Sequence, residues 1–484
     1  MDNLLNNFFS FSHKNDLISI VAADTQFSYK ELFDQSRSLA DFLSSKMVKK
    51  SEYVPVLISD QVSFIKTIIA LWYLGAIPVP LNTRLTRDEI ISIIEDYNFN
   101  FLITEINSSL SVNENRKIDQ RNFSKEQDSR AFKVIEISDS ISFKESNNNR
   151  LIPSLNDEAV VIFTSGTTSR PKGVVHTFYS LISNIQNGKS ILQNTAGDAW
   201  LASLPFYHIG GFQIICRSLY NGCKIIIPAS LQIEDIVRSL TEFNPTHLSL
   251  VSAQLEKLIN QNIRPGRQLK LSLIGGGFID DNLLLEAGKL GWNPYKVYGS
   301  SETSSFVTAI SSAEIEQRPG SVGKTLDNVQ LKISDHSEIL IKSDSLFSKY
   351  LNDIEPGQNF LDSYFRTGDS GFIDAEGYLF IEARRTDLIV TGGENVNPIE
   401  VEKVIRKING VKDVCVFPKP NKTWGQIVAC VIVSELKNPD LNTIKGILKK
   451  TLAGYKIPKE FIFTDELPKS SLGKLEREKI KKMF

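Results

Sequence analysis

A loop rich in hydroxyl groups has the composition of a phosphate site. Residues 160–177 read VVIFTSGTTSRPKGVVHT, and the apolar start at Val160–Phe163 predicts a buried strand. The loop that follows offers hydroxyl donors, free backbone N–H groups and one cation, from Thr164, Ser165, Gly166, Thr167, Thr168 and Lys172. It is not a Walker A loop, because Arg170 and Pro171 stand where that motif requires Gly-Lys-Ser/Thr. The pattern indicates a phosphate site of another kind; a polar connecting loop is the alternative.

Three further motifs carry ionisable side chains, each of which is weak evidence by itself. Glu302 follows a Tyr-Gly turn in YGSSE (298–302). Asp369 follows Thr-Gly in FRTGD (365–369), a position that often belongs to a simple turn residue. Lys474 ends PKSSLGK (468–474), and its alternative interpretation is a solvated lysine.

These motifs occur in one order along nearly the whole chain. The remaining members of the series are LPFYHIGG (204–211), IGGG (274–277), RRTD (384–387) and GGEN (392–395). Together they resemble the adenylate-forming superfamily, which comprises acyl-CoA synthetases, luciferases and peptide-synthetase adenylation domains. The resemblance implies an ATP- and Mg²⁺-dependent acid:CoA ligase, with CoA as co-substrate and an acyl-AMP intermediate. A catalytically silent nucleotide- or acyl-binding relative is the alternative from another class.

The resemblance also implies a role for individual residues. Thr164–Thr168 and Lys172 would hold the β- and γ-phosphates, and Glu302 the metal. Tyr298 would lie against adenine, Ser301 would reach the α-phosphate, and Asp369 with Arg384 would bind the ribose. Lys474 would be the catalytic lysine, bringing its charge to the reacting carboxylate and α-phosphate. The Gly275-Gly276-Gly277 turn would border the bound substrate.

A moving C-terminal lobe follows from the same resemblance. In the family the small lobe rotates between adenylation and thioester formation, about a hinge within Arg384–Asp387, which places the hinge residue at Thr386. The second pose would bring Gly392 and Gly393 to the site, where the absent side chains leave a channel for the pantetheine arm of CoA.

Two residues bear on the acid. His208 occupies the position where amino-acid-activating relatives carry an aspartate, and no aspartate occurs from Leu201 to Lys224. His208 would line the acyl pocket or control the route of the thiol; a packed core histidine is the alternative. Arg217 falls on an otherwise apolar helix behind the presumed pocket, where an unpaired charge is costly.

A second substrate carboxylate would give Arg217 a partner. The surrounding sequence looks like the o-succinylbenzoate-CoA ligases of menaquinone synthesis, whose substrate has two carboxylates. A protein carboxylate beside Arg217, and another aryl or medium-chain acid as substrate, are the alternatives.

Composition limits the class of protein. The 484 residues exceed one compact core, and the formal charge of -1 gives no indication of nucleic acid as a partner. The four cysteines lack metal-ligand spacing, and no signal peptide or bilayer-spanning segment is evident. We therefore expect a cytoplasmic enzyme with small-molecule partners and no stable membrane insertion; the sequence does not indicate an oligomeric state.

The periodicity of apolar residues predicts an α/β fold in two domains. Alternating strands and helices over residues 54–79 and 224–274 indicate parallel sheets in two αβ subdomains, and short alternating segments over 322–381 indicate a small β-barrel-like part. Asn397-Pro398 begins a helix of a C-terminal α+β unit. The predicted boundary divides residues 1–383 from a mobile lobe at 384–484. Residues 104–150 are rich in polar residues, with few apolar positions except at 131–137, and we expect a poorly ordered surface excursion there.

Overall fold

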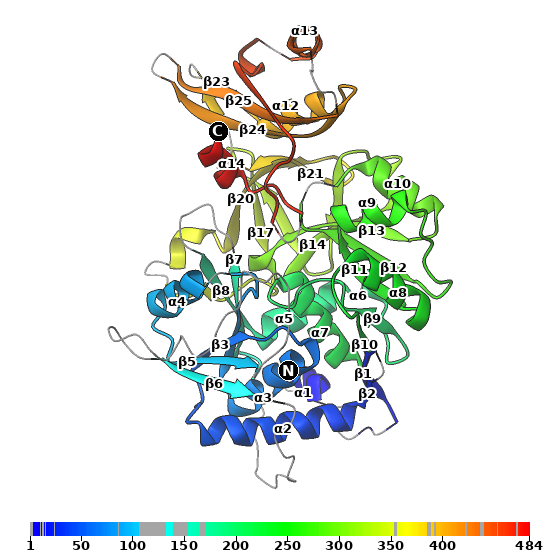
Figure 1. Cartoon of the computed structure of the whole chain (residues 1–484), viewed down its shortest axis with the longest axis vertical. Coiled ribbons are helices and arrows are strands. Elements are labelled where there is room, and N and C mark those ends of the chain that lie inside the picture. The colour runs from blue at the N-terminus through cyan, green and yellow to red at the C-terminus, as the bar shows by residue number, and fades with distance from the viewer. Residues whose placement is uncertain are drawn as a thin grey trace.

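The structure is a computed structural model with a large N-terminal and a small C-terminal domain (Figure 1). It describes the chain except residues 1–2, 10, 12–13, 15, 24, 86, 106–131, 139–152, 165–170, 278, 353–355, 385–388, 392–393, 422–423, 436–439, 453 and 471–472. The described residues confirm the predicted α/β class, since helices and parallel strands alternate along the chain of the large domain. The boundary at 383/384 stays a prediction.

The first αβ subdomain is a parallel sheet in the order β4-β3-β5-β6. Its strands are β3 (Tyr53–Leu57), β4 (Ile77–Pro80), β5 (Phe101–Glu105) and β6 (Lys133–Ile137). Its helices are α2 (Tyr29–Ser45), α3 (Gln61–Leu74) and α4 (Arg87–Asp96), preceded by α1 (Asn3–Phe9). The expectation of a surface excursion over 104–150 was wrong at β6, where Ile135 and Ile137 are buried and pair with β5.

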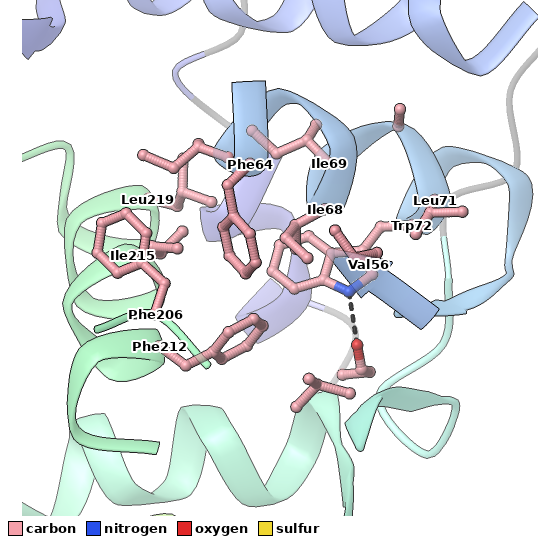
Figure 2. Packing of buried hydrophobic residues seen from close by; sticks show 14 of the residues in the cluster. Val56, Phe64, Ile68, Ile69, Leu71, Trp72, Phe206, Phe212, Ile215 and Leu219 are labelled. Atoms are coloured by element: carbon pink, nitrogen blue, oxygen red, sulfur yellow. Dashed lines mark hydrogen bonds between the residues drawn. The ribbon is translucent and has the colours of Figure 1, made fainter. Parts of the chain in front are cut away.

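Helix α3 joins this subdomain to the rest of the large domain (Figure 2). It is almost wholly apolar and starts at Asp60, whose side chain accepts from the backbone N–H of Ser63. Trp72 on α3 is 1% exposed and donates its indole N–H to the carbonyl oxygen of Ala159 at 2.7 Å. Its ring lies edge-on to Phe212 of α7 (Ile209–Asn221), with centroids 6.2 Å apart. The core therefore continues from one αβ subdomain into the next.

The second subdomain and the barrel-like part share one 14-stranded sheet. Its path is β16-β17-β20-β21-β15-β14-β13-β12-β11-β9-β10-β1-β2, with β19 paired to β20. Six strands of this path run parallel to one another: β1 (Ile18–Ala22), β10 (Lys224–Ile227), β9 (Ala199–Leu201), β11 (His247–Val251), β12 (Leu271–Gly275) and β13 (Pro294–Ser300).

The other strands of this sheet are antiparallel to their neighbours. They continue from β14 on one side of the parallel strands and consist of β2 alone at the opposite edge. These strands are β2 (Thr25–Ser28), β14 (Ser305–Ser311), β15 (Ser321–Thr325), β16 (Gln330–Ile333), β17 (Glu338–Lys342), β19 (Phe360–Leu361), β20 (Tyr364–Ile373) and β21 (Leu379–Arg384). The associated helices are α5 (Phe178–Asn187), α6 (Lys189–Leu192), α7, α8 (Ile233–Phe243), α9 (Ser252–Asn260), α10 (Asp281–Lys289) and α11 (Ser312–Ile315). The barrel-like part is thus an extension of the parallel sheet.

The predicted phosphate loop connects two antiparallel strands. β7 (Glu158–Thr164) pairs with β8 (Lys172–Thr177), and β18 (Lys349–Tyr350) adds to the far side of β8. The predicted strand at 160–163 is confirmed within β7. This small sheet brings residues 349–351 beside residues 173–175, at the start of β8.

The C-terminal domain is an α+β unit that stands at the upper end of the molecule in Figure 1. Its sheet contains β22 (Ile389–Thr391), β23 (Glu394–Val396), β24 (Val411–Asn421), β25 (Gly425–Ser434) and β26 (Glu460–Thr464). Its helices are α12 (Pro398–Arg406), α13 (Leu441–Thr451) and α14 (Arg477–Met483). The predicted helix start is confirmed, since Asn397 accepts from the backbone N–H of Ile399 at 2.9 Å.

Candidate active site

The phosphate loop is closed at its base by strand pairing. Thr164 lies opposite Lys172, and Thr164 Oγ1 donates to the carbonyl oxygen of Lys172 at 3.4 Å. Gly173 permits close packing beneath the loop, because a Cβ atom there would lie 2.9 Å from Cγ1 of Val161. The other predicted phosphate ligands lie outside the described residues: Ser165, Gly166, Thr167 and Thr168.

Tyr350 joins Lys172 to the predicted metal ligand. Its hydroxyl donates to Glu302 Oε1 at 2.9 Å, and Lys172 Nζ lies 5.0 Å from the centre of its ring. The pairing of β18 with β8 puts Tyr350 opposite Val174, two residues beyond Lys172. A cation over an aromatic face is attracted by the ring quadrupole. One tyrosine therefore brings together the cation and the carboxylate that the sequence assigned to phosphate and Mg²⁺.

Glu302 has the surroundings of a single metal-binding carboxylate. It lies on a one-turn 3₁₀ helix, Ser301–Thr303, which Thr303 fixes by accepting from the backbone N–H of Ser300 at 2.8 Å. Ser301, predicted to reach the α-phosphate, begins the same turn. The described residues contain no group of three or more His, Cys, Asp or Glu that would hold a metal by themselves. One carboxylate fits Mg²⁺ that arrives with phosphate oxygens and water as its other ligands.

The predicted adenine and ribose residues contact each other. Tyr298, near the end of β13, donates its hydroxyl to Asp369 Oδ2 at 2.8 Å. Asp369 follows Gly368, whose φ of +70° suits glycine in the turn. Arg384 stands opposite Asp369 in the pairing of β20 with β21, but its side chain lies outside what the structure describes. The backbone register is thus compatible with the predicted Asp369–Arg384 pair.

A buried carboxylate holds the Asp369 turn. Glu338 is 5% exposed and accepts from Arg366 Nε at 3.1 Å and Nη2 at 2.9 Å. It also accepts from the backbone N–H of Gly368 at 3.2 Å. Thr367 adds a bond from its hydroxyl to the carbonyl oxygen of Ile339 at 2.7 Å. The turn that presents Asp369 is therefore tied to β17 at three consecutive residues.

The Tyr350–Glu302 pair and the Tyr298–Asp369 pair open onto one cavity. It is lined by Tyr298, Gly299, Ser300, Glu302, Thr303, Ile341, Tyr350, Phe365, Arg366, Thr367 and Asp369. The proposed metal ligand and the proposed ribose ligand thus face the same space, as a nucleoside polyphosphate requires. Sequence reasoning missed Tyr350 and Glu338, because only the long-range register of β18 with β8 and of β17 with β20 reveals them.

The glycine run Gly275-Gly276-Gly277 follows the end of β12. Gly276 has a φ of +90°, which favours glycine, and a Cβ atom at Gly275 would lie 3.0 Å from Cγ2 of Val297. A Cβ atom at Gly277 would meet nothing within 4 Å. The run therefore leaves open space at its end, which is consistent with its predicted place beside a ligand.

His208 is the residue that precedes α7. Burial lowers the pKa of His208 to about 4, and the positive charge of Arg84 adds to this lowering. Its ring lies 4.7 Å from that of Tyr207, centroid to centroid. The imidazole is therefore neutral near pH 7, as a residue lining an acyl pocket is expected to be.

Arg217 is a buried guanidinium that is 1% exposed. Its hydrogen-bond partners are an amide and a hydroxyl, and within the described part of the chain it forms no ion pair with a carboxylate. Its Nη2 donates to Ser305 Oγ at 3.3 Å and to Asn184 Oδ1 at 3.5 Å, while its Nε has no partner among the described residues. The rings of Trp200 and Phe306 each lie 5.4 Å from the guanidinium carbon.

Burial lowers the pKa of Arg217 to about 10, so the group remains charged at neutral pH. Its contacts reach the segment directly after the Glu302 turn, but Arg217 is not among the residues that line the cavity described above.

Lys474 lies on a loop of the C-terminal domain that touches the large domain. The adjacent Gly473 has a φ of +72°, and a Cβ atom there would lie 3.2 Å from Cβ of Ala253 on α9. In Figure 1 the red C-terminal segment runs from the small domain down to the large one. The predicted hinge residue Thr386 and the predicted CoA-channel residues Gly392 and Gly393 lie outside the described residues.

Comparisons with known proteins agree along the length of the chain. A model of the AMP-binding enzyme family matches residues 10–351, and one of the AMP-binding enzyme C-terminal domain matches residues 400–474. The chain is 32% identical over 480 residues to the 2-succinylbenzoate–CoA ligase of Listeria innocua, covering 96% of each protein.

Solved structures give the same result. The o-succinylbenzoate CoA synthetase of Bacillus subtilis, in complex with the acyl-adenylate intermediate OSB-AMP, superimposes with a TM-score of 0.87 at 27% identity, covering 99% of this chain and 98% of that one. The same protein with ATP and magnesium ion also gives 0.87 at 27% identity, covering 99% of each chain. Within the described residues, no helix combines the length and apolar character needed to cross a bilayer.

Proposed function

Because the chain belongs to the AMP-binding enzyme family, we propose that it is an ATP- and Mg²⁺-dependent acid:CoA ligase whose acid is 2-succinylbenzoate. The observation that carries the proposal is the single cavity where Glu302, Tyr350, Tyr298 and Asp369 meet beside Lys172. Relatives named for this reaction match nearly the whole chain, and a structural neighbour binds the corresponding acyl adenylate. The proposed substrates are therefore ATP, the acid and CoA.

In the first step an oxygen of the acid bonds to the α-phosphorus of ATP, and pyrophosphate leaves. Lys172 and the loop before it hold the β- and γ-phosphates, and Asp369 binds the ribose. Glu302 would hold the Mg²⁺ that arrives with the nucleotide, and that ion would supply neutralising charge for the phosphates. Lys474 places positive charge beside the reacting carboxylate and α-phosphate, where negative charge must be stabilised as the new bond forms.

In the second step the sulfur of CoA attacks the acyl carbon, and AMP leaves with the electrons of the acyl–oxygen bond. The proposal gives the two steps different poses of the C-terminal domain, with a hinge at Thr386. Gly392 and Gly393 would then border the pantetheine arm. His208, neutral at pH 7, would line the acyl pocket where thiol and acyl group meet.

Arg217 supports an acid with two carboxylates. A buried guanidinium that has only amide and hydroxyl partners carries a large desolvation cost that an anion would offset. The second carboxylate of 2-succinylbenzoate would supply that anion, while the first is adenylated. The structure gives Arg217 no such partner among the described protein carboxylates, which favours this assignment over a structural ion pair.

The location we propose is the cytoplasm. All four cysteines are buried and free, as expected of thiols in a reducing compartment.

The test is acid-dependent release of pyrophosphate with ATP and Mg²⁺. We expect 2-succinylbenzoate to be strongly preferred over benzoate, octanoate and several amino acids. Activity with another aryl or medium-chain acid alone would retain the mechanism and remove the substrate. No pyrophosphate release with any acid would indicate the non-catalytic relative instead.

A further inference from the structure

The loop that carries Lys474 is closed on itself by backbone hydrogen bonds. Ser470 donates its N–H to the carbonyl oxygen of Lys474 at 2.7 Å, and Gly473 donates to Ser470 at 2.9 Å. At the base, Glu476 donates to the carbonyl oxygen of Pro468 at 3.0 Å. The position of Lys474 therefore follows the position of the two ends of this loop.

Arg477 fixes the C-terminal end of the loop. It lies three residues after Lys474; its Nη1 lies 2.7 Å from Glu402 Oε1, and its Nη2 donates to Glu402 Oε2 at 2.9 Å. Nη1 also donates to the carbonyl oxygen of Val416 at 2.7 Å. Glu402 is 2% exposed on α12 and accepts from the backbone N–H of Val416 at 2.8 Å. Helix, strand and loop end thus meet at one two-pronged ion pair.

Lys469 fixes the other end. Its Nζ lies 2.7 Å from Asp413 Oδ2, two residues into β24, and Asp413 Oδ1 accepts from the backbone N–H of Val414 at 2.8 Å. Arg406 Nη2 lies 3.3 Å from Asp413 and 3.9 Å from Glu402, so it connects the two attachments. Both ends of the loop are therefore attached to the first half of β24.

The loop held in this way is the part of the small domain that touches α9 through Gly473 and Ala253. We propose that Arg477, through Glu402, is a positioning residue that sets the place of Lys474 for adenylation. The inference rests on the proposed role of Lys474. A guanidinium that bridges both oxygens of a buried carboxylate fixes direction as well as distance, which a lysine ammonium does not do.

The test separates the two half-reactions in the full-length enzyme. Arg477→Lys retains the charge but loses the two-pronged geometry, so we expect acid-dependent pyrophosphate release to fall about 10- to 100-fold in kcat. The KM for ATP and thioester formation from supplied acyl-AMP and CoA should change little. Lys469→Met, which removes the more exposed attachment, should give a smaller loss of the same kind.

Two further variants make the result decisive. Lys456→Met is the matched control, since it removes the 2.7 Å ion pair with Glu400 in the same domain without touching the loop. In a Lys474→Ala background, Arg477→Lys should cause no further loss of adenylation, because the group that it positions is gone.

Equal loss of both half-reactions in Arg477→Lys, or the same loss in Lys456→Met, would show a general effect on the domain and overturn the proposal. Additive loss in the double variant would overturn it as well. If Lys474→Ala alone kept full adenylation, the role of Lys474 in the proposed function would fall instead.

Discussion

The nucleotide cavity and the Lys474 loop hold their polar groups by different means. In the cavity, Tyr298 pairs with Asp369 and Tyr350 pairs with Glu302, so these polar groups are held by other residues of the large domain. The Lys474 loop is tied to α12 and β24 of its own domain, and its Gly473 closely approaches Ala253 of the large domain.

We infer from this difference that the groups for ATP binding and the cation for the chemical step belong to separate parts of the molecule. The groups proposed to bind ATP stay in one rigid frame, because strand register and buried hydrogen bonds hold them. We propose that Lys474 is carried by a separate unit with its own frame, so that a change in the pose of the C-terminal domain would move this cation without rearranging the nucleotide site. The predictions below test this division.

The largest effect is expected for Lys474→Ala. Loss of a charge that acts on the transition state should lower adenylation by about 10²–10³-fold or more. Thioester formation from supplied acyl-AMP should be largely intact, because the cavity keeps its own groups. Separate assays of the two half-reactions measure this, with exposed Lys482→Ala as the control. Equal loss in both half-reactions would contradict the division.

Arg217→Met should give the next largest effect. The change lies in the large domain and should leave the C-terminal domain unaffected. Methionine can occupy the slot between Trp200 and Phe306, so the variant removes charge with little loss of packing. Loss of one member of a buried ion pair costs about 3–5 kcal/mol. The KM for 2-succinylbenzoate should therefore rise by about 10²-fold or more, while that for benzoate-like acids changes little. The same rise for both acids would make Arg217 a structural residue.

The order of the elements was predictable from the sequence where apolar periodicity is local. The strand at 160–163 and the helix after Asn397 were found in this way, because burial and capping are properties of a few adjacent residues. The apolar positions at 131–137 are visible in the sequence, but the strand β6 was not predicted, because its partner β5 lies about thirty residues earlier across a polar stretch.

Prediction of the candidate site from the sequence is limited in the same way, because contacts between distant segments are not visible in local patterns. The titratable groups could be named from motifs, but the contacts of Tyr350 with Glu302 and of Glu338 with Arg366 depend on strand register between distant segments. The brace of Arg477 on Glu402 joins residues that are 75 positions apart. Such pairings are set by tertiary packing, which a local pattern does not contain.

Ala253→Leu should affect the contact between the two regions. Ala253 and Gly473 pack closely, since a Cβ atom built on Gly473 would lie 3.2 Å from Cβ of Ala253. A longer side chain at position 253 should therefore obstruct the docked loop. We expect adenylation to fall about tenfold, with the thioester half-reaction retained. Glu256→Leu, at an exposed position on the same helix, is the matched control. Unchanged adenylation in Ala253→Leu would mean that this contact is dispensable.

The smallest effect is expected for Tyr350→Phe, which tests the frame of the cavity itself. The change removes the hydroxyl that donates to Glu302 but keeps the ring beneath Lys172, so the proposed metal ligand loses this hydrogen bond. A hydrogen bond of this kind contributes about 1 kcal/mol, which corresponds to an approximately fivefold weaker affinity for ATP with Mg²⁺. Calorimetric titration of ATP with and without Mg²⁺ measures the effect directly, and the loss should be confined to the titration with metal.

Tyr364→Phe is the control for that change, because its hydroxyl donates to Gln330 at 2.9 Å and Tyr364 does not line the cavity. If both variants weakened binding alike, or if Tyr350→Phe weakened it equally without Mg²⁺, the hydroxyl of Tyr350 would not be acting through the metal ligand. The binding frame would then depend on the ring and on Lys172, and Glu302 would have to be held by the turn Ser301–Thr303 alone.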